Sequence, residues 1–254
     1  MRPFLFAGPR GLPPKIGPGF REQVSDMAEE KRLVWDLPLR LFHWILVLSL
    51  IGSWVTAELG FDWMQIHMYL GYGTIGLIVF RLIWGFIGPR HARFASFIAG
   101  PSGIWRYARG LAAGTMIQTV GHNPLGGISV IVMLVLVGFQ AATGLFASDD
   151  IVWSGPYNSA VSGATADRLT SLHHLNFNFI LAAVALHIMA IAFYFLFKKQ
   201  NLVPAMLHGK KVVPEHEAIS RSEIIKAVIV IAISAGLVFW LISAAPVPAD
   251  ENYF

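Results

Sequence analysis

The sequence predicts an all-α integral membrane protein with five transmembrane helices. The chain of 254 residues is 55% hydrophobic and only 13% charged, with a mean hydropathy of +0.59, which is unlike a water-soluble domain. Its apolar runs are long enough to cross a hydrocarbon core, which takes about 20 helical residues. None of them alternates with the period of a barrel strand, so helices are the expected way to satisfy their backbone amides.

Five apolar runs are expected to span the membrane, and they divide the chain into segments. They cover residues 38–57, 66–87, 125–147, 171–197 and 224–245. Asn123 and Pro124 are typical of a helix cap and a first helical turn, and "PSGIWRYARGL" predicts an amphipathic piece between the second and third spans. We expect an irregular tail over 1–32, a domain with the first four spans over 33–199, a linker over 200–222, and the fifth helix with the C-terminus over 223–254.

The basic residues predict the orientation of these spans. With the N-terminus inside, all of the 19 lysines and arginines except Arg168 fall on the inner side, as the positive-inside rule requires. The C-terminus is then outside. The pI near 9.5 is therefore a topology signal, and nucleic-acid binding is disfavoured.

Histidine is the residue type left to hold a cofactor. The chain has no cysteine, which excludes disulfides, thiolate metal sites, iron–sulfur clusters and covalent haem attachment. Of its nine histidines, five lie in the predicted spans, where an ionisable side chain is a functional candidate.

The span histidines fall at two depths. His173 and His187 are fourteen residues apart, which is about 21 Å along a helix and only about 40° short of four full turns, so they share a face. His67 opens the second span at the outer level of His173, and His43 lies at the inner level of His187. Each pair could supply the two axial ligands of a haem iron. His174 is rotated off this face by about 100°.

Other interpretations of these histidines remain open. A single histidine in an apolar helix is more often a hydrogen-bonded structural residue than a ligand, and histidines also bind zinc or relay protons. A transport path would be expected to use carboxylates within the spans. The spans contain almost no carboxylates, since Glu58 and Glu223 lie at the ends of the first and fifth spans. The matched depths favour haem.

Three more residues are candidates for cofactor binding. Gly71 follows His67 by one turn and could leave room for a planar ligand, or could serve close helix packing. Arg81 follows His67 by fourteen residues, and Arg40 precedes His43 by about one turn. Both arginines could pair with haem propionates, or could simply anchor the helices at the membrane surface.

Several motifs together carry a resemblance to a known family. They are "VWDLPLRLFHW", "HMYLGY", "RLIWGFIGPRHARF", "GHNPLGG" and "LTSLHHLNFNF" with the "LH" ending at 187. Over about residues 33–199 the chain resembles the bacterial di-haem cytochrome b561 family, specifically members associated with periplasmic c-type cytochromes. It is also similar to the b-type cytochrome subunits of nickel-iron hydrogenases. The resemblance implies a four-helix bundle with two b haems, whose iron ligands match His43, His67, His173 and His187. The N-terminal tail and the fifth helix depart from the family core.

The function implied is electron transfer across the bacterial inner membrane, with the N-terminus cytoplasmic and the C-terminus periplasmic. Electrons would pass between the quinone pool and a periplasmic redox partner, a c-type cytochrome first of all. We expect no catalytic residue, and whether the chain counts as an enzyme, as part of a quinone oxidoreductase, is left open. The alternatives are a superoxide oxidase that reduces quinone, a hydrogenase-type membrane subunit, and a non-haem transporter. The superoxide oxidase would need a cationic outer funnel, where only Arg168 is basic.

Overall fold

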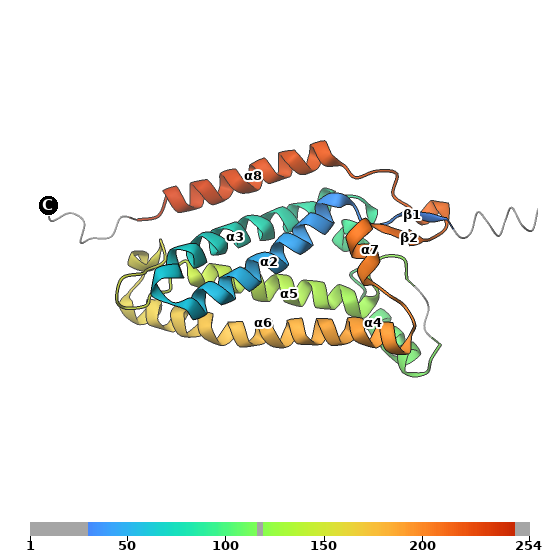
Figure 1. The fold of residues 1–254 in the computed structure, drawn as a ribbon, viewed down its shortest axis with the longest axis horizontal. Helices are drawn as coiled ribbons and strands as arrows, with labels where there is room; N and C mark the ends of the chain where they lie inside the picture. The colour runs from blue at the N-terminus through green and yellow to red at the C-terminus, as the bar shows by residue number, and fades with distance from the viewer. Residues whose placement is uncertain (1–29, 116–118, 247–254) are drawn as a thin grey trace, which may run out of the picture.

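The computed structural model describes residues 30–115 and 119–246, and it confirms the predicted fold class. Five helices are long and apolar enough to cross a membrane. They run roughly lengthwise through the molecule, with α8 lying outside the other four along α3 (Figure 1). Their bounds are α2 Leu37–Leu59, α3 Met64–Ile87, α5 Pro124–Gly144, α6 Gly163–Phe197 and α8 Ile224–Ser243.

Local hydrogen bonds explain where these helices begin. Asp36 precedes α2 and its carboxylate accepts a bond from the Leu39 amide at 3.3 Å. Asn123 caps α5 in the same way, with its Oδ1 2.7 Å from the Gly126 amide, and Pro124 occupies the first turn as predicted. These side chains satisfy amides that have no partner within the helix.

Helix α6 begins eight residues earlier than its predicted start at residue 171. It has 35 residues, which corresponds to about 52 Å and exceeds a hydrocarbon core of about 30 Å. The added turns are polar, so hydropathy alone missed them, but Ser162 caps the helix through the Thr165 amide at 3.3 Å. Helix α6 therefore projects beyond the membrane at the end that the charge pattern predicts to be outer.

The opposite end, which we call the inner end, is closed by short elements (Figure 1). Strand β1 (Lys31–Leu33) pairs antiparallel with β2 (Lys210–Val212), so the expected tail ends in a strand at its last two residues, while residues 1–29 lie outside the described ones. The amphipathic piece forms α4, as predicted. The remaining bounds are α4 Pro101–Ala112, α7 Val203–His208, and the 3-10 turns η1 Phe61–Trp63, η2 Arg90–Ala92, η3 Phe94–Ser96, η4 Asn158–Ala160 and η5 Glu215–Glu217.

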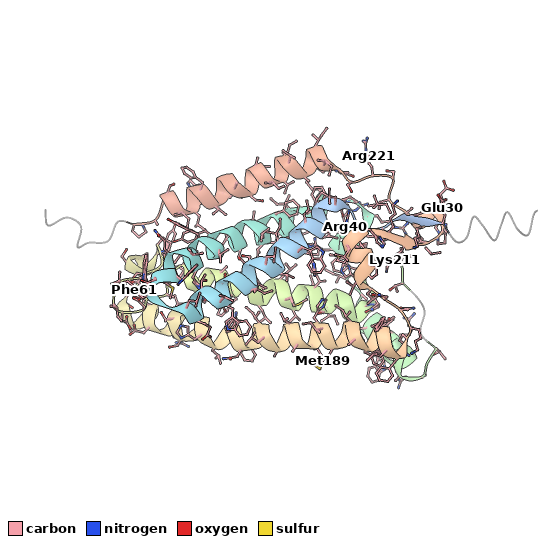
Figure 2. All side chains as sticks on the ribbon, viewed as in Figure 1. Glu30, Arg40, Phe61, Met189, Lys211 and Arg221 are labelled. Carbon is pink, nitrogen blue, oxygen red and sulfur yellow. The ribbon has the colours of Figure 1, made fainter. Side chains whose placement is uncertain are left out.

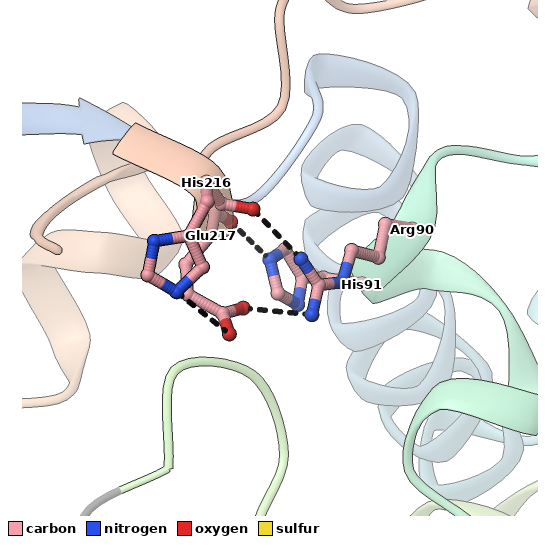
Figure 3. Close-up of polar contacts among 4 residues, drawn as sticks. All are labelled: Arg90, His91, His216 and Glu217. Atoms are coloured by element: carbon pink, nitrogen blue, oxygen red, sulfur yellow. Dashed lines mark hydrogen bonds and ion pairs between the residues drawn. The ribbon is translucent and has the colours of Figure 1, made fainter. Parts of the chain in front are cut away.

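A polar cluster holds the linker between α6 and α8 to the loop after α3 (Figure 3). Arg90 donates from Nη1 to the His216 carbonyl at 2.9 Å, and its Nη2 lies 3.0 Å from a carboxylate oxygen of Glu217. His91 Nε2 donates to the Glu217 carbonyl at 2.7 Å. The segment predicted as a linker is thus part of the packed inner end.

The best-buried core also lies at the inner end, where β1, α2 and α3 meet the linker. Trp84 is fully buried, and its indole Nε1 donates to Asp36 Oδ2 at 2.9 Å. Large apolar side chains elsewhere point outward from the helices, as expected of surfaces that face lipid. Figure 2 shows Met189 on the outward side of α6, and the labelled charged residues Arg40, Lys211, Glu30 and Arg221 together at the inner end, far from Phe61.

Candidate functional site

A cavity of about 580 Å³ lies between α2, α3, α5 and α6 near the outer end. Its walls include His67 and Gly71 from α3 and His173 from α6, which brings three of the predicted residues together. Apolar and aromatic side chains form much of the remaining wall, as is usual for a cofactor site. His67 and His173, which were expected at the same depth, therefore line the same cavity.

His67 and His173 face each other in a geometry that suits a shared metal centre. Their ring centres are 6.2 Å apart and the rings are inclined at 77°. A ligating imidazole nitrogen lies about 2 Å from its metal and about 1 Å from its own ring centre, so two rings on opposite sides of one metal stand about 6 Å apart. The observed separation matches this value.

Backbone carbonyls fix both rings. His67 Nδ1 lies 2.8 Å from the Ser53 carbonyl oxygen, and His173 Nδ1 lies 3.0 Å from that of Gln140. Each Nδ1–H therefore donates to a carbonyl, which leaves Nε2 as the unprotonated nitrogen that can bind a metal. Metal-binding histidines are usually oriented in this way.

Two glycines shape the space around these rings. A Cβ on Gly144 would lie 3.0 Å from His173 Cε1, so only glycine gives that ring its position without displacement. A Cβ on Gly71 would have nothing within 4 Å, and Gly71 lines the cavity. A larger side chain at 71 would therefore fill space that a planar ligand needs.

His174 occupies a different position from His173. It is exposed on the cavity rim, and among the described ring contacts its neighbour is His173 rather than His67. The helical phase that turns His174 away from the His67 side supports His173 as the ligand candidate.

The outer loop lines the cavity, and it brings in Trp153, a residue that the sequence analysis did not predict. Asp149 Oδ1 accepts bonds from the amides of Ile151, Val152 and Trp153 at 3.0, 2.9 and 2.8 Å, and these bonds lower the pKa of its carboxyl. Trp153 thereby lines the cavity, and its buried Nε1–H has no partner among the described residues. Such a donor suits a propionate. The polar loop gave no periodicity from which its orientation could be predicted.

His43 and His187 lie toward the inner end on α2 and α6, as predicted. The rings are near enough for the charge of one to act on the other. His43 Nδ1 is buried with no partner among the described residues, and the ring packs edge-on against Trp44 at 5.0 Å.

Arg81, on α3, lies within electrostatic range of His122, and so does His187 of the inner pair. Arg81 is only 2% exposed, its guanidinium lies 4.7 Å from the centre of the Phe94 ring, and neither Nη1 nor Nη2 has a partner among the described residues. A buried cation with free donors is costly unless an anion reaches it. Arg40 differs, because its Nη1 donates to the Leu207 carbonyl while its buried Nε lacks a described partner.

His122 near Arg81 was not singled out from the sequence. Its ring packs against Trp35 at 4.7 Å and Phe97 at 4.6 Å. Burial, together with the charges of Arg81 and Lys211, lowers the pKa of His122 to about 3, so its ring is neutral at pH 7. The depth argument considered only histidines within spans, although "GHNPLGG" already held this one.

The donor sets fit haem better than a bare ion. Within the described ranges no group of three or more His, Asp or Glu side chains gathers to hold a metal, whereas zinc is normally held by three or four protein ligands. At the outer site, two opposed imidazoles flank a large cavity. At the inner end, nitrogens of Arg81 and His122 have no partner among the described residues, and His122 lies within electrostatic range of Arg81 and His187.

Comparison with known proteins identifies the family. The family model described as prokaryotic cytochrome b561 matches residues 34–209. The chain belongs to the prokaryotic cytochrome b561 family. It is therefore a membrane b-type cytochrome that takes part in electron transfer, and its family implies that it binds haem b. It is also a multi-pass protein of a bacterial membrane.

Relatives of this cytochrome carry a common description. The chain is 24% identical over 215 residues to the "Probable Ni/Fe-hydrogenase B-type cytochrome subunit" of Rhizobium leguminosarum bv. viciae, covering 72% of this chain and 90% of the relative. A protein of the same description from Rhodobacter capsulatus is 24% identical over 232 residues, covering 77% and 87%. No solved structure gives a significant match.

Proposed function

We propose that this cytochrome holds two b haems at two depths and carries electrons between the quinone pool and a redox partner on the periplasmic side. The observation that carries the proposal is the facing of His67 and His173 across the outer cavity, with both Nδ1 atoms bound to carbonyls. His43 and His187 form the inner pair, and His187 lies about 21 Å along α6 from His173, as judged from the fourteen residues between them.

Each candidate residue has a distinct role in this proposal. His67 and His173 would hold the outer haem, and His43 and His187 the inner one. Haem b supplies a one-electron carrier when bound. Gly71 would leave room for the outer group, and Arg81 would neutralise a propionate of the inner one. Since two histidines would hold each haem iron, each site would favour electron transfer over oxygen chemistry.

The partner is proposed from charge and from the relatives. Glu58 and Asp149 line the outer cavity, which has no lysine or arginine among its described lining residues. A partner with a basic patch would complement this rim, whereas superoxide would not be attracted to it. The relatives' descriptions favour a hydrogenase-type enzyme beside the c-type cytochrome that the sequence motifs suggest. The partner that co-purifies with the chain distinguishes these alternatives, because nickel would indicate a hydrogenase-type enzyme and c-type haem a c-type cytochrome.

A haem count on the purified chain tests the proposal. Replacing either outer histidine with alanine should remove one haem and spare the inner one, and replacing either inner histidine should do the reverse. The pyridine haemochrome assay counts the haems, and the exposed His216→Ala should retain both. Two haems per chain in any of the four ligand variants would overturn the assignment. The variants are His43→Ala, His67→Ala, His173→Ala and His187→Ala.

A further inference from the structure

A second cavity, of about 310 Å³, lies at the inner end where α3 ends and α8 begins. One wall is the turn after α3 at Gly88 and Pro89, and the other comes from the linker and the first turn of α8. Four cationic side chains and one carboxylate line it: Arg90, Arg93, Arg221, Lys226 and Glu223. It lies apart from both histidine pairs, and nothing in the proposed electron path uses it.

The cations of this cavity are only partly neutralised. Arg90 is paired with Glu217, and Lys226 is paired with Glu223 while also donating to the Ile87 carbonyl at 3.2 Å. Arg93 and Arg221 are exposed, and neither has a carboxylate within 4 Å in the described part of the chain. The cavity therefore carries excess positive charge that an anion can balance.

The surfaces beside the cavity are apolar and face outward. Phe86, near the end of α3, is 72% exposed, and Ile225, in the first turn of α8, is 80% exposed. Both helices are long and apolar enough to span a membrane. Such side chains are stable when covered by lipid, so the boundary between hydrocarbon and water passes close to this cavity.

We propose that this cavity binds the phosphate headgroup of an anionic phospholipid. The four cations hold the phosphate, and the acyl chains lie along Phe86 and Ile225. Basic pockets between transmembrane helices at the cytoplasmic surface are suited to anionic headgroups. The lipid bridges α3 and α8, and so fastens the fifth helix to the four-helix bundle. A free phosphate ion satisfies the same charges but makes no use of the apolar surfaces.

The test compares lipid binding by two double variants of the purified full-length chain. Arg93→Gln with Arg221→Gln removes the two cavity cations that have no carboxylate within 4 Å among the residues the structure describes. Arg106→Gln with Arg109→Gln removes the same charge from exposed positions on α4, away from the cavity. Native mass spectrometry then measures retention of phosphatidylglycerol against phosphatidylcholine.

We expect the original chain to retain phosphatidylglycerol preferentially. The cavity variant should bind it about 25-fold more weakly, because each of the two basic residues it removes contributes about fivefold near an anionic lipid. The α4 variant should change binding less than about twofold. An unchanged haem spectrum in both variants verifies that each has folded.

Three results would overturn the proposal. Equal losses in the two double variants would show that the whole basic surface attracts the lipid. Equal retention of phosphatidylcholine would show that charge is not recognised. Displacement of the lipid by millimolar inorganic phosphate would assign the cavity to a free anion. If a variant does not fold, retention of phosphatidylglycerol by the original chain is measured at rising salt concentration. Retention that depends on charge falls as salt rises, and retention that does not fall would overturn the proposal.

Discussion

Replacing Arg81 with leucine should lower the reduction potential of the inner haem and leave the outer one unchanged. Arg81 is 2% exposed, and both of its terminal nitrogens lack described partners. A positive charge beside the inner haem stabilises its reduced form, which carries one positive charge fewer. Leucine removes that charge but preserves an apolar contact with Phe94.

The size of this shift follows from the burial of Arg81. A hydrogen bond to a charged group contributes about 1.5–3 kcal/mol, and solvent reduces it little at so buried a position. For a one-electron carrier, a tenfold change in equilibrium corresponds to about 59 mV and about 1.4 kcal/mol, so the potential should fall by about 65–130 mV. Asp36 lies within electrostatic range of Arg81, and burial raises the pKa of its carboxyl.

A redox titration that resolves the two haems measures the effect, with the outer haem as an internal reference. Arg81→Lys should produce a smaller fall, because lysine keeps the charge but loses the planar fork that can bond both oxygens of a carboxylate. If Arg81→Leu binds both haems and the inner potential does not move, Arg81 is only an anchor at the membrane surface.

Two further predictions concern the outer end. His174→Ala should retain both haems, whereas His173→Ala should lose the outer one; if the haem counts are reversed, the ligand assignment must be exchanged. Asp149→Ala should raise hydrogen exchange at the amides from Ile151 to Trp153, and Asp149→Asn should raise it less, because the amide oxygen still accepts. The bonds that lower the pKa of Asp149 favour its charged form. Their stabilisation of the loop should therefore persist at neutral pH and be lost only as the pH falls through the lowered pKa. Exchange that is unchanged in Asp149→Ala would show that other contacts hold the loop.

Hydropathy predicted most helix ends because the membrane imposes one length on every span. The ends of α2, α3, α5 and α8 fall within three residues of the predicted runs. The start of α6 lies eight residues before its predicted run, because residues 163–170 continue the helix into water with polar side chains. The cap at Ser162 was the available signal, and hydropathy does not register it.

The candidate site was predictable where residues lie on helices and obscure where they lie in loops. The place of His67 at the start of its span predicts its depth, and helical spacing predicts the face that His173 shares with His187. Trp153 and His122 reach their positions through an Asp149-centred turn and through packing against Trp35, and neither arrangement leaves a period in the sequence. Cooperative tertiary contacts place such residues, so a sequence pattern alone does not reveal them.

The short pairing of β1 with β2 constrains how the chain is threaded through the bilayer. Two strands can pair only within one aqueous compartment, so the chain between Leu33 and Lys210 must cross the membrane an even number of times. Four crossings satisfy this parity, and a nascent chain that skipped one insertion would leave the strands in separate compartments. Pairing becomes available only after α6 has entered the bilayer. The pairing therefore ties the two ends of the four-helix segment together on one side of the membrane, and α8 follows this segment in the chain.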